Sequence, residues 1–187
     1  MTKLEAVNTI LRSIGQAPVD SIQGSTNVDV VLAESIMDQV SEEVQSQGWH
    51  FNIDEDVELS PDSNDEIPLP SDTIYGDVEY PEQYQRDVVV RNGKFYNRTE
   101  NSFTFDNPIK ATLIRSFSFD SLPPEFQQYV THASAARFYA SEVGDTPMLT
   151  ELRRREQTAY ARLQQYDSDT GDYSPYRTPN ILFGMTR

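Results

Sequence analysis

The sequence predicts an α+β fold in which both chain ends form a bundle of about four helices around an inserted β module. Apolar residues recur with the helical period in residues 1–48 and again in residues 122–166. Between these regions, residues 49–121 include segments that alternate with a period near two and an Asn92-Gly93 hairpin signal. At 187 residues, the chain is the size of one domain with a substantial core.

The first helix is predicted from a capping box and a one-sided apolar pattern. Thr2 and Glu5 have the spacing at which each side chain caps the other's backbone N–H. Gly15 supplies a left-handed stop. The apolar positions of this helix are Leu4, Val7, Ile10, Leu11 and Ile14.

The second helix leads into the segment QSQGWHFNID, where the pattern changes. Asn27 is a good cap for a helix over roughly residues 28–47, and Gly48 ends it. From Trp49 onward the alternation is typical of a half-buried strand. The predicted core side carries Trp49, Phe51 and Ile53, and the predicted outer side carries His50, Asn52 and Asp54. Gly48, Trp49 and Phe51 are therefore expected to form a structural junction between helices and sheet.

The middle of the chain predicts an antiparallel sheet. Residues 60–72 form a proline-spaced acidic loop that excludes a strand interior. Asn92 and Gly93 lie between two β-forming runs and favour a two-residue hairpin turn. Further strands are expected within residues 103–105 and 109–119.

Two more helices and an arm complete the chain. Leu122-Pro123-Pro124 starts a helix that ends at Gly144, and Thr146-Pro147 starts another that reaches about Tyr166. The first of these has its predicted packing side at Phe126, Val130, Ala133, Ala136, Ala140 and Val143. Residues 167–187 have no period and predict an arm that orders on a neighbouring subunit or another partner.

The charge excludes several classes of function. Thirty acidic and fifteen basic residues give a net charge of −15, which predicts no general phosphate-binding surface and repulsion from anionic membranes. The chain has no cysteine, so thiolate metal sites and cysteine nucleophiles are excluded. Neither a signal peptide nor a membrane span is expected, which predicts a soluble, unexported chain.

The residues that could carry out chemistry are most simply explained as structural or surface residues. His50 and His132 have no metal-ligand spacing around them, and nucleotide and serine-hydrolase motifs are absent, so no catalytic residue, metal or cofactor is expected. His132 is expected in a helix–helix seam. Residues 167–172 only partly match a calcium loop and are interpreted as a solvated turn.

Acidic residues leave one enzymatic alternative open. Asp54, Glu55, Asp56 and Glu58 are most simply a solvated stretch. A carbohydrate-cleaving hydrolase would require one of a carboxylate pair to have a raised pKa inside an aromatic cleft. An accessory binding module is a third class of function that the sequence leaves open.

One basic cluster interrupts the acidic sequence. Arg153, Arg154 and Arg155 lie on the last predicted helix, beside Glu151 and Glu156. They are expected either to pair along the helix surface or to contact an acidic neighbour, including another copy of this chain.

Several motifs together resemble a known family. These are LEAVNTILRSIGQAPV, the helix that ends in QSQGWHFNID, and LPPEFQQYVTHASAARFYASEVGD. They are similar to the tail tubular protein A family of T7-like short-tailed phages, also called the tail adaptor or gatekeeper.

This resemblance implies a structural virion protein that is not an enzyme. It implies a dodecameric ring in the virion tail, assembled in the host cytoplasm, that joins the portal protein to the nozzle protein, tail tubular protein B, and helps seat the tail fibre. DNA would pass through the ring without specific binding. The arginine cluster is the expected ring interface, the Asn92-Gly93 turn is expected to meet the nozzle, and the arm with Tyr173, Tyr176 and Arg177 is expected to meet the portal.

Overall fold

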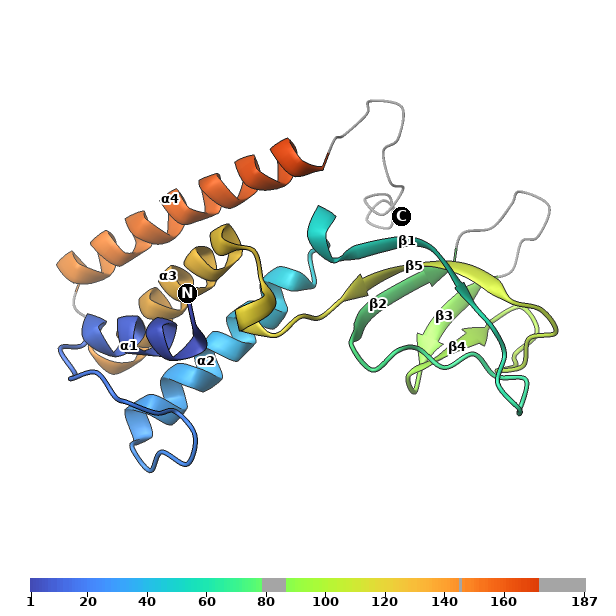
Figure 1. Ribbon diagram of the computed structural model, residues 1–187, viewed down its shortest axis with the longest axis horizontal. Coiled ribbons are helices and arrows are strands. Elements are labelled where there is room, and N and C mark those ends of the chain that lie inside the picture. Colours follow the sequence, from blue (N-terminus) through green and yellow to red (C-terminus); the bar gives the residue numbers. More distant parts are fainter. Residues whose placement is uncertain (79–86, 145, 172–187) are drawn as a thin grey trace.

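The computed structural model describes residues 1–78, 87–144 and 146–171. It confirms the α+β fold: an elongated molecule has a helical module at one end and a β module at the other (Figure 1). The helices are α1 (Lys3–Ser13), α2 (Val28–Gln45), α3 (Pro124–Glu142) and α4 (Thr146–Thr170), with short 3-10 helices η1 (His50–Asn52) and η2 (Phe119–Ser121). The strands are β1 (Ile53–Leu59), β2 (Thr73–Val78), β3 (Val88–Arg91), β4 (Lys94–Asn97) and β5 (Ile109–Arg115).

Local capping signals define the first two helices. The Thr2 side chain accepts from the Glu5 N–H at 3.2 Å, and the Glu5 carboxylate accepts from the Thr2 N–H at 2.8 Å, which confirms the capping box. Asn27 caps α2 by accepting from the Asp29 N–H at 2.9 Å. Both helices therefore begin where the sequence predicted.

Helix α3 is the centre of the helical module, because α1, α2 and α4 all pack against it (Figure 1). Its buried residues occupy most of its circumference and include Phe138 and Tyr139 as well as the predicted Phe126 and Val130. The predicted single stripe is therefore too narrow. It is also wrong at Ala140 and Val143, which are exposed beyond the end of the packed region, just before Gly144 turns the chain.

The described residues of the β module form two small antiparallel sheets. One has the strand order β1-β5-β2, and the other is the β3-β4 hairpin. Asn92 and Gly93 have φ values of 53° and 69°, and Arg91 pairs with Lys94, which confirms the two-residue turn. The apolar core of this module includes Ile67, Phe95, Phe105 and Leu113 and is separate from the core of the helices.

Two predicted features of the β region have different outcomes. Residues 60–72 contain no strand, as expected. The strand predicted at 103–105 is wrong, since Thr104 makes an isolated bridge with Glu66 and the segment joins no strand ladder. The Phe105 N–H bonds to the Asp65 carbonyl at 2.8 Å, so a loop contact replaces a strand ladder there.

Helix α4 is one turn longer than predicted. The expected end at Tyr166 and the expected solvated turn from residue 167 are wrong, because the helix continues to Thr170. The hydroxyls of Ser168 and Thr170 donate to carbonyls four residues earlier, at 2.9 and 2.7 Å, so their hydrogen-bond partners lie within the helix. Tyr173, Tyr176 and Arg177 of the predicted arm lie outside the described residues.

Candidate functional site

The junction between the two modules contains a group of buried polar side chains that are hydrogen-bonded to both chain segments. The polypeptide crosses there twice, once between α2 and β1 and once between β5 and α3 (Figure 1). The sequence predicted an alternating strand from Trp49, and this is wrong: residues 50–52 form η1, and β1 starts only at Ile53.

Trp49 lies in the core of the helical module. Its indole Nε1–H donates to the Val44 carbonyl at 2.6 Å, and its ring meets the Phe126 ring edge-on at a centroid distance of 5.1 Å. The Phe51 ring also contacts the Phe126 ring, at a centroid distance of 4.3 Å. These aromatic contacts fix the end of α2 against α3.

Asn52 was predicted to face solvent but is completely buried. Its side-chain oxygen accepts from the Trp49 N–H at 2.8 Å, and its amide nitrogen donates to the carbonyls of Gln45 and Arg115, each at 2.9 Å. One side chain therefore joins both chain crossings. His50, in contrast, is exposed, as predicted.

Gln45 is a second buried amide that bridges the crossings. It accepts from the Phe117 N–H at 2.7 Å and donates to the Phe117 carbonyl at 3.1 Å, so the two residues pair as in a strand ladder. Only 1% of Gln45 is exposed. Because unpaired polar groups are costly to bury, these bonds hold the junction in one arrangement.

Gly48 lets the chain turn sharply at the junction. Its φ is +73°, and an added Cβ would lie 3.0 Å from the Ile114 Cδ1 of β5. Any larger residue would have a strained backbone and would push against the sheet.

Arg115 closes the outer side of the junction. Its guanidinium lies 2.6 Å from the Asp72 carboxylate and 3.5 Å from that of Asp54. The hydrogen bond from Arg115 lowers the pKa of Asp72. The bonds that Gln45, Asn52 and Arg115 make to Phe117, Arg115 and Asp72 were not predicted from the sequence, since the residues in each of these pairs lie more than 40 positions apart.

The arginine cluster lies on the outer surface of α4. Arg154 and Arg155 each contact Glu151 at 2.8–2.9 Å, and Arg153 contacts Glu156 at 3.2 Å. The pairing expected along the helix is therefore present. The three guanidinium groups remain at least half exposed, and three arginines against two carboxylates leave a positive surface.

His132 lies on α3 and is close to the arginines of α4. The pKa of His132 is lowered mainly by burial of the imidazole, and the positive charges of Arg155 and Arg162 on α4 lower it further. This places His132 in the predicted seam between helices.

The carboxylates considered for hydrolysis do not converge on a cleft. Asp54, Glu55, Asp56 and Glu58 are all exposed along β1, and the first and third have cationic partners at Arg115 and Lys110. Among residues 1–78, 87–144 and 146–171 there is no cluster of three metal-ligating side chains. In this same part of the chain, no helix is both long enough and apolar enough to cross a bilayer.

Asn92 and Gly93 form the exposed tip of the β3-β4 hairpin. The Gly93 carbonyl accepts from the Leu69 N–H at 2.9 Å, so the turn is braced by the loop that precedes β2. The hairpin tip and the arginine cluster belong to different modules, so the structure does not bring these predicted interface residues together.

The two modules have separate cores and are joined by a polar junction, and comparison with known proteins gives the class of the protein. Residues 4–173 match the tail tubular protein family, and the chain belongs to this family. It is also similar to "Tail tubular protein A" of Klebsiella phage KP34, with 27% identity over 144 residues that cover 77% of this chain and 75% of the relative. The chain is a structural protein of the phage tail, and the family resemblance is confirmed.

Proposed function

We propose that the chain forms the adaptor ring that joins the portal protein to the nozzle protein of the tail. Copies assembled in the host cytoplasm form a closed ring, with twelve as the number that the resemblance implies. The ring lines part of the DNA ejection channel and helps seat the tail fibre.

The observation that carries this proposal is the elongated subunit with two separately packed modules (Figure 1). A connector must contact different proteins at its two ends and keep these contacts at a constant separation. The buried amides of Gln45 and Asn52 supply that constraint, because rotation of one module against the other would break several hydrogen bonds at once.

The charge of the chain fits passage of DNA through the ring. At a net charge of −15, the subunits repel phosphate and would not hold the moving polymer. This supports a passive channel wall rather than a nucleic-acid-binding surface.

A closed ring of identical chains requires two different faces of each subunit to match. We assign the positive surface of Arg153, Arg154 and Arg155 to one of these faces and acidic surface of the neighbouring copy to the other. Replacing all three with glutamate should prevent ring assembly, as measured by native mass. Replacing them with lysine keeps the charge and should preserve the ring. Assembly of the glutamate variant into the same ring would contradict the assignment.

We assign the hairpin tip to the nozzle. A short peptide tag inserted between Asn92 and Gly93 should block nozzle binding in a pull-down and leave portal binding intact. Equal loss of both would indicate misfolding, and unchanged nozzle binding would contradict the assignment.

The test of the whole proposal is electron microscopy of the purified chain, alone and mixed with portal. Rings, or rings that form only on the portal, are expected. A chain that stays monomeric in both samples would favour the alternative classes. Turnover of purified polysaccharide that is lost on substitution of one carboxylate, such as Asp54→Asn, would favour the hydrolase.

A further inference from the structure

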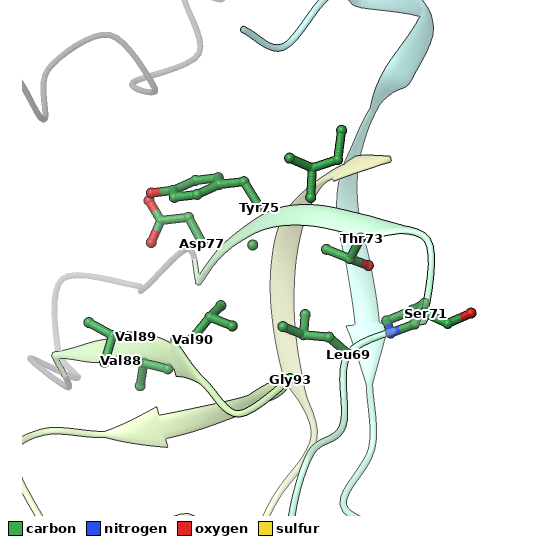
Figure 2. Close-up of a pocket in the computed structure, with 12 residues that line it drawn as sticks. Leu69, Ser71, Thr73, Tyr75, Asp77, Val88, Val89, Val90 and Gly93 are labelled. Carbon is green, nitrogen blue, oxygen red and sulfur yellow. The ribbon is translucent and has the colours of Figure 1, made fainter. Parts of the chain in front are cut away.

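Two strand edges of the β module face a common cavity. In the described part of the chain, β2 pairs only with β5 and β3 pairs only with β4, so each has one side without a strand partner. A cavity of about 440 Å³ lies between them (Figure 2). Strand edges of this kind are templates for an additional extended segment.

The cavity has a mostly apolar lining, with the polar residues Ser71 and Thr73 and one carboxylate. Tyr75 and Asp77 lie on the β2 side, and Val88, Val89 and Val90 lie on the β3 side (Figure 2). Tyr75 and Val90 are 48% and 40% exposed and both line this one cavity, so they form an adjoining exposed apolar surface. The occupant should therefore be an extended segment with apolar side chains and positive charge.

The other edge of the three-stranded sheet is protected. Strand β1 exposes Asp54, Glu55, Asp56 and Glu58, and a bulge with φ +56° at Asp56 interrupts its register. Charges and bulges are the usual means by which proteins prevent edge pairing. Strand β2 also has a register irregularity, between Thr73 and Tyr75, but it exposes one carboxylate, Asp77, where β1 exposes four. Among the described residues, the β2 edge is therefore less protected by charge than the β1 edge.

One segment of this chain has the matching chemistry. Residues 173–187, YSPYRTPNILFGMTR, contain Arg177 and Arg187 and no acidic residue, although the chain as a whole has twice as many acidic as basic residues. The proline-free run from residue 180 to 187 includes Ile181, Leu182 and Phe183. It is longer than both the six residues of β2 and the four of β3. Isoleucine and phenylalanine favour extended structure.

We propose that residues 180–187 of one copy dock as an extended strand in the β2/β3 groove of a neighbouring copy. The apolar side chains cover Tyr75 and Val90, and an arginine pairs with Asp77. The choice of a neighbouring copy rests on the proposed ring, since arm and groove would form two unlike, complementary faces. The arm is thereby assigned to a second copy instead of the portal.

Site-directed crosslinking tests this docking in the full-length chain, which has no native cysteine. Chains with Leu182→Cys are mixed with size-tagged chains with Val90→Cys, assembled, and treated with a short bis-maleimide. The matched control replaces Val90→Cys with Val31→Cys, a valine of α2 that is 53% exposed. Since a docked thiol has a high effective concentration, we expect at least about tenfold more mixed dimer with the groove cysteine than with the control. Tyr75→Cys, on the other side of the groove, should behave like Val90→Cys.

The remaining outcomes each decide the proposal. Equal crosslinking to Val31→Cys would show random collision and overturn it. Crosslinking of Leu182→Cys to portal subunits, with none to the groove, would identify the portal as the occupant and also overturn it. A ring of the expected mass without groove crosslinks would contradict the docking of residues 180–187 but not the proposed adaptor ring. Groove crosslinks in a chain that forms no ring would support the docking and contradict the proposed adaptor.

Discussion

The backbone N–H of His50 donates a hydrogen bond to Oδ1 of Asp167, with 2.8 Å between nitrogen and oxygen. This bond connects η1, at the junction, to the last turn of α4, 117 residues further along the chain. It explains why α4 extends beyond its predicted end, because the last turn has a partner to hold it. It also means that the junction contacts helices from both ends of the chain.

We expect Asp167→Ala to destabilise the end of α4 by about 0.5–1.5 kcal/mol, since the His50 N–H loses its acceptor. Hydrogen exchange of the last α4 turn measures this loss. Asp169→Ala, an exposed position in the same turn, is the matched control and should have little effect. The idea is wrong if both variants exchange alike.

We expect Trp49→Ala to lower the free energy of unfolding by about 3–5 kcal/mol, because it removes a large buried ring from the helical core. Trp49→Phe keeps most of the aromatic packing and should lose about 1 kcal/mol with the hydrogen bond to Val44. Urea denaturation of both variants provides the comparison. Equal losses for the two would show that the ring contacts contribute little.

Gly48→Ala and Gly15→Ala separate backbone strain from steric contact. Both residues have positive φ, +73° and +79°, so each substitution should cost about 1–2 kcal/mol. Only at Gly48 would the new Cβ meet a neighbour, Ile114 Cδ1 at 3.0 Å, whereas the Gly15 position is open. We expect a further loss of about 1–3 kcal/mol at Gly48 from overpacking, measured by thermal or urea unfolding. Identical losses of unfolding free energy for the two variants would mean that the Ile114 side chain moves aside without destabilising the protein.

Glu151 should titrate far below an ordinary glutamate. Hydrogen bonds from Arg154 and then Arg155 lower its pKa from 4.5 to about 2. Because the folded-state value is the lower one, any stabilisation from these pairs is present above pH 4.5 and is lost as the pH falls through about 2. Carboxyl NMR should show this midpoint.

Arg154→Gln should raise the pKa of Glu151, whereas Arg153→Gln should leave it unchanged, since Arg153 pairs with Glu156 instead. An equal shift in both variants would contradict the specific pairing.

The features that the sequence predicted well depend on neighbouring residues. The Thr2–Glu5 capping box and the Asn92-Gly93 turn each involve residues at most three positions apart, so their geometry follows from local backbone preferences. Asn52 is different, because its burial depends on the Arg115 carbonyl, 63 residues away. No periodicity in the sequence contains that information.

The errors in the helices have the same origin. Ala140 fits the apolar period of α3, but no other element covers it, so it is exposed. The last turn of α4 is held by the bond from the His50 N–H to Asp167. The sequence predicted His50 in a strand, so this contact was not expected. The arginine cluster was identifiable from sequence, whereas the β2/β3 groove was not, since it requires two separate sheets to meet.

The most direct test of the adaptor assignment is the native mass of the purified 21.3 kDa chain as portal is added. We expect closed rings of a single copy number, twelve by the family resemblance, either alone or bound to portal. A chain that remains monomeric and fails to bind portal at every ratio would contradict the central claim.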